Sequence, residues 1–267
     1  MLIAWRTLKA RLRKYKIVRA KRLPDVKYND TADIDRFIFI CGLQRSGTTL
    51  LERLLVSKYE LSCLRASTPE SEGEHIQSVF TAALRFGGAG RFAFSTEALE
   101  ELNRLDDYPA HRAAILDAWR PFVVGDSPTL VEKSPPNLTK IPWLRKVFPG
   151  SQFIIMTRDP RAVAGATQKW SMTTLPELMM HWNVAYSQAL EDFDESDCIT
   201  VRYEDLIDHS ETELERLGQF LNLTPRTEHL EIEARHQKLV NMNGKYIAAH
   251  GGTRYGEGVW NRFGYTC

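Results

Sequence analysis

The sequence has few of the features that mark secreted or membrane-spanning proteins. Its 267 residues include only four cysteines, Cys41, Cys63, Cys198 and Cys267, and no pair has the spacing of a zinc site or a dense disulfide pattern. Free thiols in a reducing compartment are the simplest interpretation, so we expect a cytoplasmic protein. No apolar run reaches the about 20 residues of a membrane span. The N-terminus also lacks the long apolar core of a signal peptide.

An overall excess of one charge is also missing, but the charges are unevenly spread. The chain has 35 basic and 34 acidic residues. Residues 1–23 hold nine basic residues and no acid, which leaves 26 basic against 34 acidic residues in the remainder, a net charge of −8. A basic segment can contact anionic lipid or nucleic acid, although a solvated helix or tail is the simpler interpretation. We expect no nucleic-acid partner and leave a peripheral membrane contact through residues 1–23 open.

Internal repeats and long low-complexity linkers are absent as well. A hydrophobic content of 43% at this length suits one sizeable domain. We predict a basic leader over residues 1–30 and a single α/β domain over residues 31–267. Strand-like runs at residues 129–131, 152–157 and 199–203 alternate with helix-like stretches, which predicts a largely parallel sheet with helices on both faces. The glycine-rich and aromatic residues 241–267 are predicted to form loops.

The most informative stretch follows the apolar run at residues 37–41. A glycine-bounded loop and a helix-like pattern come next, which is the order of a buried strand, a phosphate loop and a helix N-terminus. Gly42 and Gly47 keep the spacing of the nucleotide-binding pattern, but Thr48 stands where an ATPase carries lysine. The positive charge is on Arg45 instead. A loop without its lysine points away from ATP hydrolysis and toward a different phosphate-bearing donor.

This loop has the chemistry of an anion site. Its glycines allow successive N–H groups to point into one concavity beside the positive end of a helix. Thr48 and Thr49 add hydroxyl donors, and the guanidinium of Arg45 matches phosphate or sulfate oxygens. The candidate binding residues of the loop are Gln44, Arg45, Ser46, Gly47, Thr48 and Thr49. A plain strand-to-helix turn that contains glycines is the alternative.

Four polar clusters follow predicted strands, at the edge where open α/β sheets form their ligand crevice. The clusters are Gln44-Arg45-Ser46, Glu132-Lys133-Ser134, Arg158-Asp159 and Tyr203-Glu204-Asp205. Three of the four carry a cation, which predicts one anion site built from several segments. Asp159 is a weak Mg²⁺ candidate and no acid resembles a Walker B residue, so no metal is predicted. Metal-free handling of a phosphorylated donor suits sulfuryl transfer better than phosphoryl transfer, which relies on Mg²⁺.

These motifs resemble those of the sulfotransferases that use 3′-phosphoadenosine 5′-phosphosulfate (PAPS). The similar segments are residues 42–49, Glu132-Lys133-Ser134-Pro135, Arg158-Asp159-Pro160-Arg161-Ala162-Val163 and Tyr203-Glu204-Asp205-Leu206. The similarity covers most of residues 35–222. It is strongest to the bacterial and tyrosylprotein-type branch, because the small-phenol branch has lysine in place of Arg45. The resemblance implies the sulfotransferase fold and PAPS as co-substrate.

The resemblance also implies roles for individual residues. Arg45 and the backbone of residues 46–49 would hold the 5′-phosphosulfate, and Lys133 would contact its bridging or sulfuryl oxygens. Arg158 would bind the 3′-phosphate, and Tyr203 would touch the adenine side. The family usually has a serine eight residues after the arginine as a second 3′-phosphate ligand. Ala166 stands there in this chain, so Thr167 or Gln168 is the expected substitute.

The acceptor hydroxyl needs a base within reach of its proton. Residues 69–75 follow a short second strand predicted at residues 62–65, where the glutamate base of related families resides. We choose Glu72, because Gly73 beside it permits a close backbone approach. Glu74 is the second choice, His75 the third, and Glu70 is a further candidate. Glu72, Arg45 and Lys133 form the predicted catalytic set, in which the two cations stabilise the leaving 3′,5′-bisphosphate.

Three functions stay open at this point. The first is a PAPS-dependent sulfotransferase acting on an acceptor hydroxyl of a carbohydrate, tyrosyl peptide, lipid or small alcohol. The second is a P-loop kinase or phosphotransferase, and the third is a non-catalytic protein that retains the donor cleft. Residues 76–128 and 171–185, with Trp170, His181 and Trp182, are predicted to shape the acceptor pocket.

Overall fold

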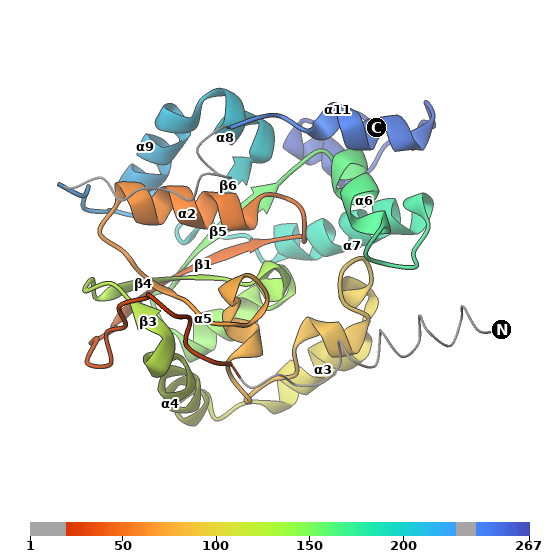
Figure 1. Ribbon diagram of the computed structural model, residues 1–267. Coiled ribbons are helices and arrows are strands. Elements are labelled where there is room, and N and C mark those ends of the chain that lie inside the picture. The colour runs from red at the N-terminus through yellow and green to blue at the C-terminus, as the bar shows by residue number, and fades with distance from the viewer. Residues whose placement is uncertain (1–19, 228–238) are drawn as a thin grey trace.

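A sheet of six strands runs through the part of the chain that this computed structural model describes, residues 20–227 and 239–267 (Figure 1). The strands are β1 (Arg36–Gly42), β2 (Ser62–Leu64), β3 (Val123–Val124), β4 (Thr129–Lys133), β5 (Gln152–Thr157) and β6 (Cys198–Arg202). Their order is β3-β2-β4-β1-β5-β6. Only β3, at one edge, pairs antiparallel among these described strands. The predicted parallel sheet is therefore confirmed.

Helices connect the strands and cover the sheet. The α-helices are α2 (Thr48–Lys58), α3 (Thr96–Arg104), α4 (Tyr108–Trp119), α5 (Ile141–Val147), α6 (Pro160–Gln168), α7 (Leu175–Glu191), α8 (Tyr203–Asp208), α9 (Ser210–Phe220) and α11 (Asn243–Ile247). Short 3₁₀ turns are η1 (Pro69–Ser71), η2 (Gly73–His75), η3 (Ala83–Phe86), η4 (Phe92–Phe94), η5 (Arg120–Phe122), η6 (Pro135–Thr139), η7 (Ala248–His250) and η8 (Val259–Phe263).

The central strand β1 explains why helices pack on both faces. Side chains alternate across a strand, so Phe37, Phe39 and Cys41 enter one apolar cluster while Ile38 and Ile40 enter the other. The first cluster includes residues of α4, α5 and α7, and the second includes residues of α2, α8 and α9. Figure 1 shows α2, α8 and α9 together on one side of the sheet and α4 and α5 on the other. This is the predicted arrangement.

The prediction of loops over residues 241–267 is wrong in part. Asn243–Ile247 forms helix α11, which packs on α6 so closely that a Cβ on Gly165 would lie 2.6 Å from the carbonyl oxygen of Tyr246. The glycine that allows this contact lies about 80 positions away in the sequence. A local pattern in residues 241–267 therefore does not report the packing that stabilises the helix.

The segment before the first strand also contacts the domain where it is described. The N–H of Asn29 donates to the carbonyl of Val123 at 2.9 Å, and the N–H of Ser67 donates to the carbonyl of Lys21 at 2.9 Å. Most of the basic segment, residues 1–19, lies outside the described residues, and so does the membrane contact predicted for it. Among the described residues, none of the helices combines the length and apolar character that crossing a membrane requires.

Candidate active site

The loop between β1 and α2 has the geometry of a phosphate loop. Ser46 is completely buried, and its N–H and hydroxyl both donate to the carbonyl of Leu43, at 3.1 and 2.6 Å. These two hydrogen bonds close the loop and leave Arg45 exposed, with a positive φ of 75°. No side chain caps α2 at Gly47. The first N–H groups of the helix, at Thr48 and Thr49, therefore lack an intrahelical acceptor and face the loop as donors.

Gly47 is required at its position for two independent reasons. Its φ of 105° lies in the left-handed region that favours glycine. A Cβ there would also lie 2.7 Å from Cδ2 of Tyr203 and 3.0 Å from Cε of Met156. The start of α2 thus packs directly on residues at the ends of β5 and β6.

Arg158, just after β5, is buried and its contacts leave one nitrogen without a partner. Its Nε donates to Oδ1 of Asn243 at 2.8 Å, and its Nη1 donates to the carbonyl of Arg45 at 2.8 Å. Its Cζ lies 4.2 Å from the centroid of the Tyr203 ring. Nη2 is buried and has no hydrogen-bond partner among the described residues. Burial lowers the pKa of Arg158, so the cluster has a cation that an anionic ligand would stabilise.

The third strand end brings Lys133 against Glu72. Nζ of Lys133 lies 3.0 Å from Oε1 of Glu72 and also donates to the carbonyl of Glu70 at 3.2 Å. Both charged side chains are at least nine-tenths buried as residues, at 5% and 8% exposed. The backbone of β4 pairs with β1, so Lys133 and the phosphate loop end at the same edge of the sheet. The predicted catalytic pair is therefore brought together.

The environment of Glu72 favours its charged form. Burial alone would raise the pKa of Glu72, but Lys133 and the hydrogen bond from His75 outweigh it and lower the pKa. Nε2 of His75 lies 3.5 Å from Oε2 of Glu72. Burial opposes the protonated form of His75, but Glu72 and Glu74 outweigh this effect and raise its pKa.

Glu74 is engaged in structural contacts. Its carboxylate accepts from the N–H of Ala83 at 3.2 Å and lies 3.6 Å from Nζ of Lys140. Glu72, Glu74 and His75 also offer one ligand atom each within 4.8 Å of one another, a spacing that suits a metal ion. Because Lys133 and Lys140 lie against two of these carboxylates, we interpret the group as an ion-pair network. Asp159, the weak Mg²⁺ candidate, caps α6 by accepting from the N–H of Arg161 at 2.9 Å.

Thr167 is not among the hydrogen-bond partners of the Arg158 side chain, which are Asn243 and Arg45. Together with Gln44 and His181, it lines a small cavity of about 10 Å³, which is close to the volume that one water needs. Oγ1 of Thr167 and Oε1 of Gln44 are buried without partners in the part of the chain that the structure describes. Ala166 is completely buried. The role of Thr167 as the second 3′-phosphate ligand stays a prediction.

The sheet, the phosphate loop and the three converging strand ends agree with a comparison to known families. The family model of the sulfotransferases matches residues 37–228. This chain belongs to the sulfotransferase family.

Individual relatives in this family are moderately similar to the chain. Protein-tyrosine sulfotransferase A of Caenorhabditis elegans is 28% identical over 216 residues, which are 74% of this chain and 52% of the relative. Protein-tyrosine sulfotransferase 1 of Danio rerio is 28% identical over 208 residues, covering 70% of this chain and 53% of the relative. A crystal structure of a sulfotransferase from Mycobacterium avium aligns with a TM-score of 0.48 and 15% identity, over 85% of this chain and 71% of that one. The chain spans about half the length of the curated relatives it matches.

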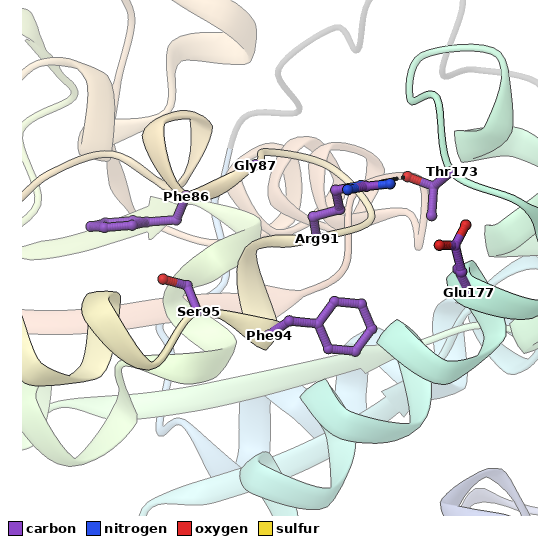
Figure 2. A pocket seen from close by; sticks show the side chains of 7 residues that line it. All are labelled: Phe86, Gly87, Arg91, Phe94, Ser95, Thr173 and Glu177. Atoms are coloured by element: carbon purple, nitrogen blue, oxygen red, sulfur yellow. Dashed lines mark hydrogen bonds between the residues drawn. The ribbon is translucent and has the colours of Figure 1, made fainter.

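A larger cavity opens on the side of this sulfotransferase-family domain where residues 76–128 and 171–185 were predicted to form the acceptor pocket. It has a volume of about 380 Å³ and is lined by Phe86, Gly87, Arg91, Phe94, Ser95, Thr173 and Glu177 (Figure 2). Figure 2 shows Arg91 extending toward Thr173, to which its Nε donates at 3.2 Å. Trp170 is 61% exposed, whereas Trp182 is completely buried in the core and cannot line a solvent-open pocket.

Sequence reasoning missed two groups that hold this site together. Asn243, from the segment predicted to be loop, is the partner of Arg158 Nε and also donates to Oε1 of Glu204 at 2.6 Å. Glu132 was noted only as the neighbour of Lys133, but it is a buried hydrogen-bond acceptor for the loop that carries Glu72. A charged residue directly after the apolar pair Leu130-Val131 was the available signal, because such residues are rarely buried without a partner.

Proposed function

We propose that this protein transfers a sulfuryl group from PAPS to an acceptor hydroxyl. The observation that carries the proposal is the contact of 3.0 Å between Lys133 and Glu72 at the edge of the sheet where the phosphate loop ends. This contact combines a cation that would stabilise the leaving group with a carboxylate that would take the proton of the acceptor hydroxyl. Membership of the sulfotransferase family supports sulfuryl transfer. The kinase alternative is weakened by Thr48 in the lysine position and by the use of Asp159 as a helix cap.

The donor would lie across the ends of β1, β5 and β6. Arg45, the hydroxyls of Thr48 and Thr49 and the first N–H groups of α2 suit the 5′-phosphosulfate. The 3′-phosphate would bind Arg158, whose Nη2 is buried without a partner among the described residues. Tyr203, stacked under Arg158, would contact the adenine side. These residues would give each anionic group of the donor, the 3′-phosphate and the 5′-phosphosulfate, a cationic partner.

In the proposed reaction the acceptor oxygen forms a bond to sulfur as the bond from sulfur to the bridging oxygen breaks. Negative charge then develops on the leaving 5′-phosphate, where Arg45, Lys133 and the N–H groups of α2 would stabilise it. Glu72 would take the proton of the acceptor hydroxyl. If Lys133 moves toward the donor, burial of Glu72 is less opposed and its pKa rises, which makes it a stronger base when donor is bound.

Glu72 suits the role of base better than its neighbours do. Glu74 already accepts a backbone N–H and faces Lys140. His75 has a raised pKa, so more of it is protonated at a given pH than of an ordinary histidine. Glu70 is exposed and contributes its backbone carbonyl to Lys133.

The acceptor would approach through the cavity of Figure 2. Phe86 and Phe94 give it aromatic walls, and Arg91 adds a cation. Exposed apolar side chains gather in the same parts of the chain, at Leu84, Phe94, Leu99, Trp170, Met172 and Met180. This lining favours an acceptor with an aromatic or apolar surface beside its hydroxyl. The relatives named as protein-tyrosine sulfotransferases make tyrosyl peptides the first acceptors to test, before carbohydrates, lipids and small alcohols.

Calorimetric titration tests the donor class. The ligand is 3′-phosphoadenosine 5′-phosphate with EDTA present, with AMP and Mg²⁺-ATP as comparators. Metal-independent binding that needs the 3′-phosphate supports the proposal, and a preference for Mg²⁺-ATP would restore the kinase alternative. The variant Arg158→Ala tests the contact proposed for the 3′-phosphate. Arg216→Ala is its matched control, because Arg216 is a surface arginine that pairs with Glu213.

Transfer of labelled sulfate from PAPS to a panel of tyrosyl peptides, sugars and alcohols tests the reaction itself. We expect Glu72→Gln to lower kcat by about 100-fold or more while the affinity for 3′-phosphoadenosine 5′-phosphate is retained. Glu70→Gln and Glu74→Gln change carboxylates of the same loop and serve as controls. Unchanged turnover in Glu72→Gln would remove it as the base, and donor binding without turnover on the panel would favour a binding protein.

A further inference from the structure

Glu132 is a buried carboxylate that the proposed chemistry does not use. It is 2% exposed and precedes Lys133 on β4. Its Oε1 accepts from the N–H of Gly73 at 2.9 Å and from the hydroxyl of Ser134 at 2.5 Å, and its Oε2 accepts from Nδ2 of Asn137 at 2.6 Å. Burial raises the pKa of Glu132, so keeping a carboxyl group in this place is costly. One of its three donors is the backbone directly after Glu72.

Gly73 is held from both sides. Its N–H donates to Glu132, and its carbonyl accepts from Nε1 of Trp119 at 3.0 Å. A Cβ at this position would lie 2.8 Å from Oε1 of Glu132 and 2.9 Å from Cζ2 of Trp119. The absence of a side chain is therefore what lets the loop approach these two residues.

The backbone before Glu72 does not set the position of the carboxylate by itself. Glu70 and Ser71 both have positive φ angles, of 46° and 57°, a conformation that non-glycine residues seldom adopt. Such a conformation persists only where surrounding contacts impose it. Some of these contacts are local, because the hydroxyl of Ser71 bonds the backbone of Ala66. The others come from β4, where Glu132 holds Gly73 while Lys133 holds the carbonyl of Glu70 and the carboxylate of Glu72. Two consecutive strand residues thus fix the loop on both sides of Glu72.

We infer that Glu132 is a positioning residue, which acts through the N–H of Gly73 to hold the Glu72 carboxylate where it can take the acceptor proton. The inference rests on the proposed role of Glu72 as base. A displacement of about 1 Å at a reacting group can cost about 100-fold in rate. This role depends on the carboxylate oxygen of Glu132 more than on its charge, because a backbone N–H needs only a hydrogen-bond acceptor.

The test compares Glu132→Ala with Glu132→Gln, which keeps an oxygen for the N–H of Gly73. We expect Glu132→Ala to lower kcat by about 10- to 100-fold and Glu132→Gln to recover most of that loss. Affinity for 3′-phosphoadenosine 5′-phosphate should stay unchanged in both variants. In the Glu72→Gln background, single-turnover rates should show no further loss from Glu132→Ala, because a residue that acts only through Glu72 cannot act once the base is gone.

Several outcomes would overturn the inference. They are a fully active Glu132→Ala, an equal loss in the presence and absence of Glu72, or a loss of donor affinity that accounts for the whole effect. If Glu132→Ala does not fold, Trp119→Phe replaces it in the same cycle, because it removes the hydrogen bond to the carbonyl of Gly73 and keeps an aromatic ring at this buried position. A wild-type protein that binds no donor, or a fully active Glu72→Gln, would instead reject the proposed function itself.

Discussion

The guanidinium of Arg158 lies over the ring of Tyr203, with its Cζ 4.2 Å from the ring centroid. The same ring contacts Gly47 at the start of α2. One aromatic side chain therefore supports both the cation proposed for the 3′-phosphate and the glycine that starts the helix of the phosphate loop. The ends of β1, β5 and β6 form one unit through this contact.

Removing the Arg158 guanidinium should weaken donor binding. We expect Arg158→Ala to lower the affinity for 3′-phosphoadenosine 5′-phosphate by about 10- to 100-fold, since hydrogen bonds to charged groups contribute about 1.5–3 kcal/mol. Affinity for AMP should change little, because AMP has no 3′-phosphate. Tyr203→Phe keeps the ring under Arg158 and should bind donor nearly as well as the wild type, whereas Tyr203→Ala should not. Equal losses for both nucleotides in Arg158→Ala would contradict the assignment.

Lys133 should control the acid limb of the pH–rate profile. The pKa of Glu72 is lowered in the folded protein, so the base stays ionised until the pH falls below the ordinary carboxyl range. In Lys133→Met burial is less opposed and the pKa rises, so the acid limb should shift to higher pH. Lys140→Met is the control, because Lys140 faces Glu74. The measurement is kcat/KM against pH, which reports the pKa values of the free enzyme, and an unshifted limb in Lys133→Met would show that another group titrates.

A side chain at Gly47 should damage both stability and donor binding. The strain of a positive φ and the contact with Tyr203 together predict a loss of about 3 kcal/mol in Gly47→Ala. Gly150→Ala is the matched control, because Gly150 has a φ of 79° but nothing within 4 Å of an added Cβ. It should cost about 1 kcal/mol and leave donor affinity unchanged. Urea denaturation and calorimetry of both variants separate backbone strain from steric contact.

His181 should make the fold less stable in mild acid. Burial lowers the pKa of His181 to about 3, while in the unfolded chain it has its ordinary value near 6.5. His181 is therefore protonated in the unfolded state while it stays neutral in the folded state, and the free energy of unfolding falls as the pH drops from about 6.5 toward 3. Between pH 7 and pH 5 the loss is about 2 kcal/mol.

His181→Gln keeps an acceptor for the N–H of Ala93 without the titration. In urea denaturation at pH 7 and pH 5, its stability should fall by about 2 kcal/mol less than that of the wild type. An equal fall in both proteins would mean that burial does not keep His181 neutral in the folded protein.

The sequence was sufficient for the parts of this protein whose signals are local. The apolar run at residues 37–41 predicted β1, and Gly47 after it predicted the start of α2, because a short apolar run and the backbone freedom of glycine are properties of neighbouring residues. The polar residues Arg45, Lys133 and Arg158 each followed a strand-like run. Parallel strands end at one edge, so their convergence could be inferred without knowing the strand order.

The tertiary structure alone decided which of these residues touch and what holds them. Glu70, Glu72, Glu74 and His75 are equivalent by position, and only packing against β4 brought Glu72 to Lys133 and turned Glu74 toward Lys140. Glu132 acquired its partner from a loop about 60 residues earlier. Contacts of this kind join distant segments through burial and hydrogen-bond satisfaction, which no local pattern encodes. The sequence therefore determined the chemistry available at the sheet edge, and the fold assigned that chemistry to particular side chains.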